Sequence, residues 1–127
     1  MKNTNRIFLL FIIFTIFSCN ENLSLNEKDV VKYDYLKPFL SKDKSDFKGN
    51  HNIDSEDFEF SYIVSNTKNT LHEIDEKAME EGWNKRSINS NTISYTKQIK
   101  IFESELSLVV VYIKFFKNNN RIHFEVK

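Results

Sequence analysis

Glycine is scarce in this chain of 127 residues. Gly49 and Gly82 are the only two, and they lie far apart. Dinucleotide-binding motifs, P-loops and the G-x-S-x-G nucleophile elbow all need glycines within a few residues of one another. The sequence therefore excludes these nucleotide sites and this type of nucleophile site.

Cysteine is scarcer still, with a single residue, Cys19, in the stretch TIFSCN. The chain after Cys19 has no thiol, which excludes thiol catalysis, cysteine-ligated zinc and a disulfide in that part. Its stability must therefore come from a hydrophobic core.

An apolar run precedes this cysteine. Lys2 and Arg6 are followed by IFLLFIIFTIF at residues 7–17. A basic start and a short apolar run are typical of a signal peptide. A helix of this length rises about 16 Å and cannot cross a hydrocarbon core of about 30 Å. The run therefore predicts a signal peptide and not a permanent transmembrane helix.

The end of this run resembles the lipobox of bacterial lipoproteins. A lipobox has an aliphatic residue, a variable residue, a small residue and then cysteine, and Ile16, Phe17, Ser18 and Cys19 fill these four places. Phe17 departs from the commonest pattern, which has a smaller residue there. The alternative is a plain secreted or uncleaved protein in which Cys19 is incidental.

The resemblance implies a lipid anchor and a cellular location. In that family the cysteine thiol receives a diacylglycerol, the preceding peptide is removed, and the new amino terminus is usually acylated. Residues 1–18 would then be lost and Cys19 would be acylated, and two or three acyl chains hold a protein on a membrane where one does not. Asn20 stands where some two-membrane bacteria have an aspartate that retains lipoproteins in the inner membrane. We therefore expect a protein of the bacterial cell envelope, anchored in the outer membrane.

Charge gives no indication of a nucleic-acid partner. Removal of residues 1–18 takes away Lys2 and Arg6 from the 18 basic residues, which leaves 16 against 18 acidic residues, a net charge of −2. Nucleic-acid binding requires a basic patch or stripe. The expected partners are the membrane, through Cys19, and an envelope protein or apolar ligand.

The chain after the signal peptide divides into two parts. Residues 19–57 are polar and lack a sustained period, which predicts a lipidated N-terminus and a partly disordered tether that could reach about 120 Å when extended. Within this part, VVKYDYLKPFL at residues 30–40 is too apolar for a simple spacer, and Pro38 argues against a long helix there. Residues 58–127 are expected to form one small domain.

The pattern of residues 58–127 predicts one helix and five strands. Residues 70–82 have the spacing of a helix that starts with a capping box of Thr70 and Glu73 and ends at Gly82, with Trp83 packed back on Ala78. Asp75 falls beside the apolar stripe of this helix for no apparent reason. Alternating residues predict strands at 58–64, 84–88, 92–102, 105–117 and 121–126.

This order, β-α-β-β-β-β with short connections, predicts a two-layer α+β fold. One helix would pack on an antiparallel meander sheet of four or five strands. The order is similar to that of cystatin-like folds, but the Q-x-V-x-G protease-binding loop of cystatins has no match, since the nearest stretch, QIKIF, has no glycine.

One predicted strand is apolar on both faces. Leu106, Leu108, Val110 and Tyr112 point one way, and Val109, Val111, Ile113 and Phe115 point the other. A single helix covers one face, so the second needs another cover: residues 30–40 folding back, a second subunit, or a ligand or partner. We take the row of Val109, Val111, Ile113 and Phe115 as the candidate interaction face.

The polar residues form no complete catalytic or metal motif. HEIDE at residues 72–76 begins like the zincin motif but has Glu76 where the second histidine belongs, and DSED at residues 54–57 lacks the spacing of a calcium loop. Arg121, His123 and Glu125 form a polar row on the last strand, which is either a recognition row or the solvated face of an edge strand. We expect no cofactor, no metal and no catalytic residues.

Three hypotheses on function follow. The first is a non-catalytic envelope lipoprotein that binds a protein or apolar ligand through the sheet face without a helix. The second is a self-protection or inhibitor lipoprotein, tethered where a toxin or lytic enzyme acts. The third is a small hydrolase that uses surface carboxylates, which requires a cleft that joins two acidic groups.

The lipobox interpretation predicts a result for Cys19→Ala. The wild-type full-length protein, expressed in a bacterium with a lipoprotein pathway, should lose residues 1–18, gain acyl mass and pellet with membranes, because Cys19 carries the lipid. The variant should do none of these. Intact mass and membrane fractionation measure both, and equal masses for the two proteins contradict the interpretation.

Overall fold

The computed structural model describes residues 22–52, 57–102, 105–116 and 118–127. The signal segment and Cys19 lie outside the described residues. Within these ranges the chain forms the following elements in order: β1 (Asn22–Ser24), α2 (Glu27–Val31), the 3-10 helix η1 (Asp34–Phe39), β2 (Ser45–Asn52), β3 (Phe58–Ile63), α3 (Thr67–Glu80), β4 (Asn84–Asn89), β5 (Thr92–Phe102), β6 (Glu105–Phe116) and β7 (Asn119–Val126).

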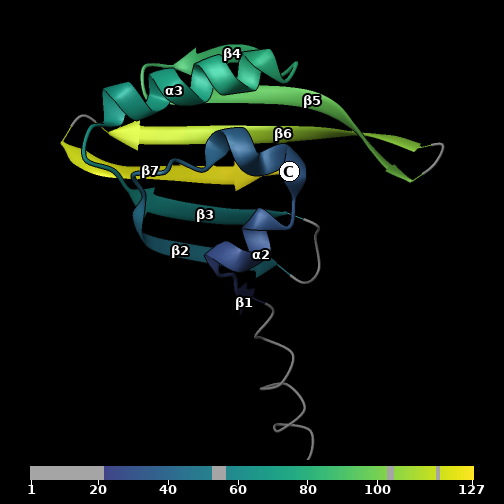
Figure 1. Cartoon of the computed structure of the whole chain (residues 1–127), viewed down its shortest axis with the longest axis horizontal. Helices are drawn as coiled ribbons and strands as arrows, with labels where there is room; N and C mark the ends of the chain where they lie inside the picture. The colour runs from purple at the N-terminus through teal and green to yellow at the C-terminus, as the bar shows by residue number, and fades with distance from the viewer. Residues whose placement is uncertain (1–21, 53–56, 103–104, 117) are drawn as a thin grey trace, which may run out of the picture.

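The strands form one antiparallel sheet in the order β1-β2-β3-β7-β6-β5-β4 (Figure 1). Strands β4 to β7 follow one another as a meander, and β7 then pairs with β3 on its other side. Cα partners such as Phe60 with Phe124 and Tyr62 with Ile122 set this register. The last strand of the chain therefore lies in the middle of the sheet and joins its two halves.

The expected fold of one helix on four or five strands is wrong, because the sheet has seven strands and three helical segments accompany it. The helix and the five strands predicted in residues 58–127 are present. The additional elements come from residues 22–52, where a tether was expected. The reason is that β2 is a polar strand near the sheet edge, with residues that are exposed or half-buried, so it shows no apolar alternation.

Gly49 allows the chain before β2 to pack closely on this strand. A Cβ at position 49 would lie 2.7 Å from the carbonyl oxygen of Leu25. The amide of Leu25 donates a hydrogen bond of 2.9 Å to the carbonyl of Gly49. This backbone contact holds the N-terminal segment against the sheet without an apolar signal in the sequence.

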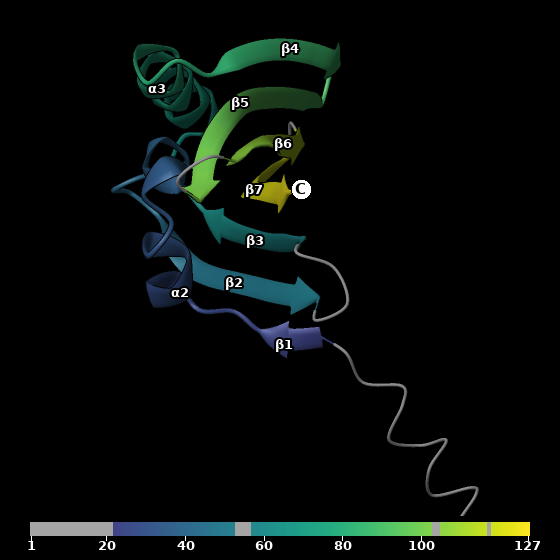
Figure 2. The ribbon, with the colours of Figure 1, turned by 90° about the vertical axis from the view of Figure 1, so that its right-hand side faces the viewer.

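All three helices lie on one face of the sheet (Figure 2). Residues 30–40 do fold back on the sheet, but beside α3 and not on the second face. Seven strands about 4.8 Å apart span roughly 29 Å, whereas a helix with its side chains is about 10 Å wide. One helix cannot cover such a sheet, so α2 and η1 complete the layer that α3 begins.

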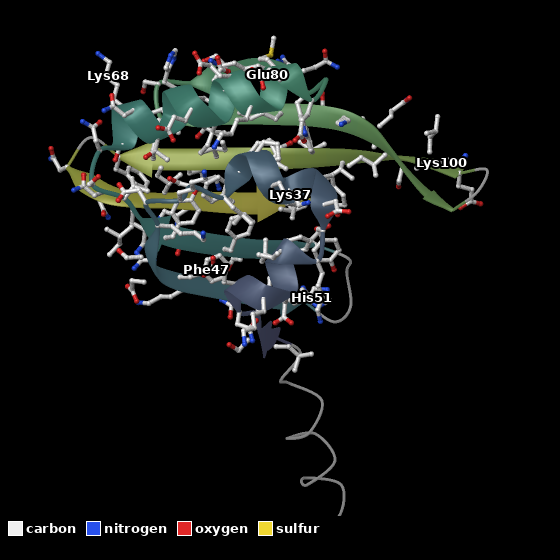
Figure 3. All side chains as sticks on the ribbon, in the orientation of Figure 1. Lys37, Phe47, His51, Lys68, Glu80 and Lys100 are labelled. Carbon is white, nitrogen blue, oxygen red and sulfur yellow. The ribbon has the colours of Figure 1, made fainter. Side chains whose placement is uncertain are left out.

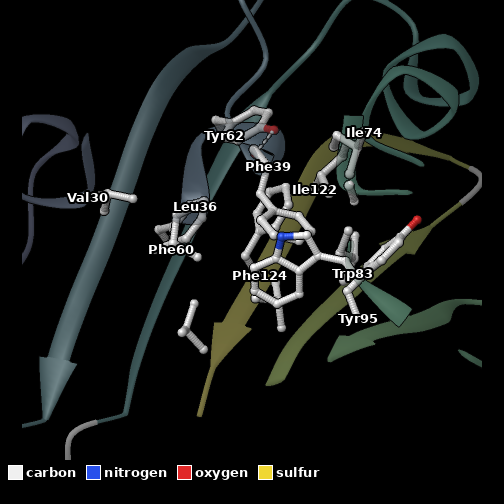
Figure 4. Close-up of a cluster of buried hydrophobic side chains, with 14 of the residues drawn as sticks. Val30, Leu36, Phe39, Phe60, Tyr62, Ile74, Trp83, Tyr95, Ile122 and Phe124 are labelled. Carbon is white, nitrogen blue, oxygen red and sulfur yellow. Dashed lines mark hydrogen bonds between the residues drawn. The ribbon is translucent and has the colours of Figure 1, made fainter. Parts of the chain in front are cut away.

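The core fills the space between this helical layer and the sheet (Figure 4). Phe39 of η1 packs edge-on against Trp83 and Tyr95, with ring centroids 4.9 and 5.5 Å apart. Phe60 stacks on Phe124 across the β3–β7 pair, with centroids 4.6 Å apart. The helical segment before the sheet and strands from both of its halves therefore share one hydrophobic core.

The structure confirms the predicted end of α3 and corrects its start. Gly82 has a φ of +88°, the amide of Trp83 donates to the carbonyl of Ala78 at 2.9 Å, and that of Gly82 donates to Met79. These bonds form a Schellman motif. The helix begins at Thr67 and not at Thr70, because the Asn66 side chain accepts from the Asn69 amide and caps it.

Asp75 fastens α3 to the sheet, which explains its place beside the apolar stripe. Its carboxylate accepts a hydrogen bond of 2.8 Å from the Tyr95 hydroxyl and lies 3.2 Å from Lys85 Nζ. Burial acts to raise the pKa of Asp75, but the bonds from Tyr95 and Lys85 outweigh it, so the pKa is lowered. Burial, together with the Asp75 carboxylate, raises the pKa of the Tyr95 hydroxyl.

We expect Tyr62→Phe to destabilise the fold. The buried Tyr62 hydroxyl donates to the carbonyl of Phe39 at 2.6 Å and accepts from the amide of Ser41 at 3.3 Å. Its loss leaves two backbone groups without their partner, at a cost of about 1–3 kcal/mol. Urea denaturation measures this. Tyr112→Phe, at a partly exposed tyrosine of β6, is the control, and an equal effect of both changes contradicts the role of the Tyr62 hydroxyl.

Asp75→Asn should destabilise the protein in a pH-dependent manner. Since the folded-state pKa of Asp75 is lowered, its charge contributes stability above the unfolded-state pKa, and this is lost as pH falls through the folded-state pKa. We expect a loss of about 0.5–1 kcal/mol at neutral pH. Urea denaturation at pH 7 and pH 3 should show the gap to wild type closing at the lower pH. Asp34→Asn, at an exposed pair, should show a smaller gap.

Candidate functional site

The candidate interaction face on β6 lies in the core. Val111 and Ile113 are fully buried and Val109 is nearly so, while Phe115 packs against the core. This row points toward the helices, so the prediction that it forms the interaction face is wrong. Tyr95 pairs with Val111 and Ile93 with Ile113 across β5, which brings further apolar side chains to the same side.

The opposite row of β6 remains uncovered. We name the sheet face without helices the open face, and the row of Leu106, Leu108, Val110 and Tyr112 the β6 stripe. Leu106 is 66% exposed and Leu108 is 61% exposed. Lys100, which pairs with Leu106, lies on the β5–β6 hairpin that extends beyond the helices (Figure 3). The β6 stripe is therefore an exposed apolar row that is continuous from the hairpin into the sheet.

A groove lies beside this stripe on the open face. It consists of two adjoining hollows of about 300 and 410 Å³, which share Asn50, Glu59 and Glu125 in their linings. The larger hollow also has Lys114 and His123 in its lining. The groove thus spans β2, β3, β7 and β6 and is lined by charged groups of both signs.

The row of Arg121, His123 and Glu125 lies in the middle of this face. Sequence reasoning left open whether β7 is an edge strand, and its pairing with both β3 and β6 shows that it is not. Glu125 forms an ion pair of 2.7 Å with Lys114 of β6. Among the described residues, the His123 side chain has no hydrogen-bond or ion-pair partner. It is therefore available to a ligand in the groove.

Arg121, by contrast, has a structural role. Its guanidinium donates to Ser61 Oγ at 2.9 Å and to the carbonyl of Asp46 at 3.1 Å, and it forms an ion pair with the Asp46 carboxylate. Asp46 has a φ of +49° where the β2–β3 register shifts. Arg121 thus joins β2 to β3 at this irregularity, where a bulge disrupts the backbone pairing of the two strands.

Two glutamates line the groove side by side. Glu59 of β3 and Glu125 of β7 are direct cross-strand partners. Like charges placed opposite each other on a sheet are unfavourable. Among the described residues, the Glu59 carboxylate has no hydrogen-bond or ion-pair partner. The pair can accept hydrogen bonds from a cationic or amide group. The structure therefore meets the condition of a cleft that joins two acidic groups, and it does not remove the hydrolase hypothesis.

Sequence reasoning missed Glu59 because its neighbour Glu125 is far along the chain. The alternation of residues 58–64 indicates that Glu59 points away from the core, but only the β3–β7 register brings it beside Glu125. No local pattern encodes that register, so the groove could not be predicted.

The predicted absence of a metal motif concerns two segments. His72 Nε2 lies 3.1 Å from a Glu76 carboxylate oxygen, and both side chains are largely exposed. In the described part of the chain, no three histidine or acidic side chains come together as metal ligands. Of the acidic stretch 54–57, only Asp57 belongs to the described residues, and it lines the smaller hollow of the groove.

Comparison with known proteins gives no relative: no family model, curated protein or solved structure matches this chain. The helices in the described ranges are too short or too polar to span a bilayer. The residues of the chain and the geometry of its open face are therefore what indicate its function.

Proposed function

We propose that this protein is a lipid-anchored component of the bacterial cell envelope that binds another envelope protein or an apolar ligand through its open face. The β6 stripe is the observation that carries the proposal. Apolar side chains that remain exposed in a contiguous row mark interaction sites more often than scattered ones do. The helical layer occupies only the other face, which leaves the stripe and the adjacent groove accessible together.

The groove adds polar contacts beside the apolar ones. Interfaces commonly combine an apolar centre with a polar rim that supplies hydrogen bonds. Here the exposed Leu108 and the half-buried Val110 would provide the centre, and Lys114, His123 and Glu59 would provide the rim. Such a mixed surface suits a protein partner better than a purely apolar small molecule.

The lipid anchor at Cys19 supplies the location. The basic start, the apolar run and the lipobox-like residues 16–19 support it from the sequence alone. Anchoring confines the protein to a surface, which raises the local concentration of any partner in the same membrane. Binding through an exposed row of moderate size is then sufficient for a stable association.

Site-specific photo-crosslinking tests the binding surface. A photoreactive phenylalanine analogue placed at Leu108 in the full-length protein, in cells of its own host, should give a discrete adduct, because position 108 is within the binding surface. The same analogue at Met79, which is 56% exposed on α3, is the matched control. Mass spectrometry identifies the adduct.

A second change makes the result specific. Leu106→Arg should abolish the adduct at position 108, yet change the free energy of unfolding by less than about 0.5 kcal/mol, since Leu106 is exposed. An adduct that forms equally at positions 79 and 108, or that persists in Leu106→Arg, contradicts the proposed binding surface.

A further inference from the structure

The ordered domain begins very close to the proposed lipid anchor. β1 starts at Asn22, the third residue after Cys19. Whatever path the chain takes, three residues span at most about 11 Å. The headgroup region of one leaflet is roughly 5–8 Å thick, from the difference between the whole bilayer and its hydrocarbon core. A lipid on Cys19 therefore keeps the start of β1 within a few ångströms of the headgroups.

Exposed apolar side chains lie on β1 and at the end of α2, the first two elements of the ordered domain. Leu23 is 56% exposed, Val31 is 47% exposed, and Tyr33 is also exposed. Leu23, Lys32 and Tyr33 line one hollow of about 500 Å³. We name Leu23, Val31 and Tyr33 the N-terminal patch. It lies where the chain enters the domain, near His51 in Figure 3.

The patch is held in place by the fold. The Tyr33 ring stacks on Phe58, with centroids 5.2 Å apart. α2 has a capping box in which Asn26 and Asp29 exchange hydrogen bonds of 3.1 Å. Leu23 pairs with His51 in the β1–β2 ladder. The exposed side chains therefore form a preformed surface and not a loose end.

The chemistry of this surface suits the boundary between lipid and water. Aromatic side chains such as tyrosine are enriched at headgroup level, and lysines extend their charge toward water from an apolar base. Lys28 lies on α2, and Lys32 is the C-cap residue that follows Val31. The Lys32 side chain remains 78% exposed although Asp29 is 3.9 Å away. The patch thus combines apolar, aromatic and basic groups at the end of the domain nearest to Cys19.

We propose that the N-terminal patch docks the domain on the lipid surface, so that the protein rests directly on the membrane. This inference depends on the lipid anchor of the proposed function. The sheet then stands on its β1 edge, with its strands stacked away from the bilayer. β6 is the fourth strand beyond β1 in the sheet and would lie about 19 Å above it. The open face would remain accessible from the side.

A fluorescent label on the patch tests this orientation. Acylation consumes the only native thiol, so a cysteine introduced by Val31→Cys reacts alone. The full-length acylated protein, labelled with the environment-sensitive dye NBD, is placed in phosphatidylethanolamine–phosphatidylglycerol vesicles that contain a headgroup-quencher lipid. We expect a blue shift and strong quenching at position 31. Met79→Cys, on α3 at the opposite edge of the sheet, should show neither (Figure 1).

Each outcome separates docking from anchoring. A protein that carries acyl mass and floats with the vesicles, yet shows no quenching at position 31, overturns the docking inference and leaves the anchor intact. Equal quenching at positions 31 and 79 overturns it as well. Cys19→Ala with the label at position 31 should not be quenched, and equal quenching there shows that the dye inserts by itself, which also overturns the inference. A wild-type protein without acyl mass refutes the anchor and docking together.

Discussion

The pairing of β7 with β3 is the constraint on which the rest of this structure depends. It joins the meander of β4 to β7 to the N-terminal elements and makes one sheet of what would be two. On the helical side it stacks Phe60 on Phe124 and so forms the centre of the core. On the open face the same register places Glu59 beside Glu125 and creates the groove. Core and candidate site are thus two sides of one strand pairing.

The sequence predicts those elements that have a strong local pattern. The alternation of residues 58–64 and 121–126 and the helix end at Gly82 are found as expected. The predicted start of α3 lies too late in the chain. Thr70 and Glu73 have the spacing of a capping box although both lie within the helix, whereas Asn66 is the actual cap. β1 and β2 were not predicted, because strands at or next to the sheet edge bury little and their polar residues show no apolar alternation.

The two-sided apolar pattern of β6 shows what a single strand cannot reveal. Both rows are suitable for a core, and alternation alone does not decide which one the helices cover. The cross-strand partners on β5 determine which row is buried. Ile93 and Tyr95 lie on the side of Val111 and Ile113. Thr96 and Gln98 lie on the side of Val110 and Leu108. Apolar partners across the strand mark the buried row, and polar partners mark the row left to solvent. Once the pairing is known, the exposed row becomes the candidate binding surface.

The free edge of the sheet at β4 has a consequence for contacts between copies of the protein. All six residues of β4 are exposed, and its outer backbone groups have no strand beside them in the described structure. An unpaired strand edge is a template on which the sheet of a second copy can pair. Lys85 and Arg86 place two positive charges on this edge, and such charges oppose strand pairing between like copies. These charges therefore make β4 a poor template for joining the sheets of two copies.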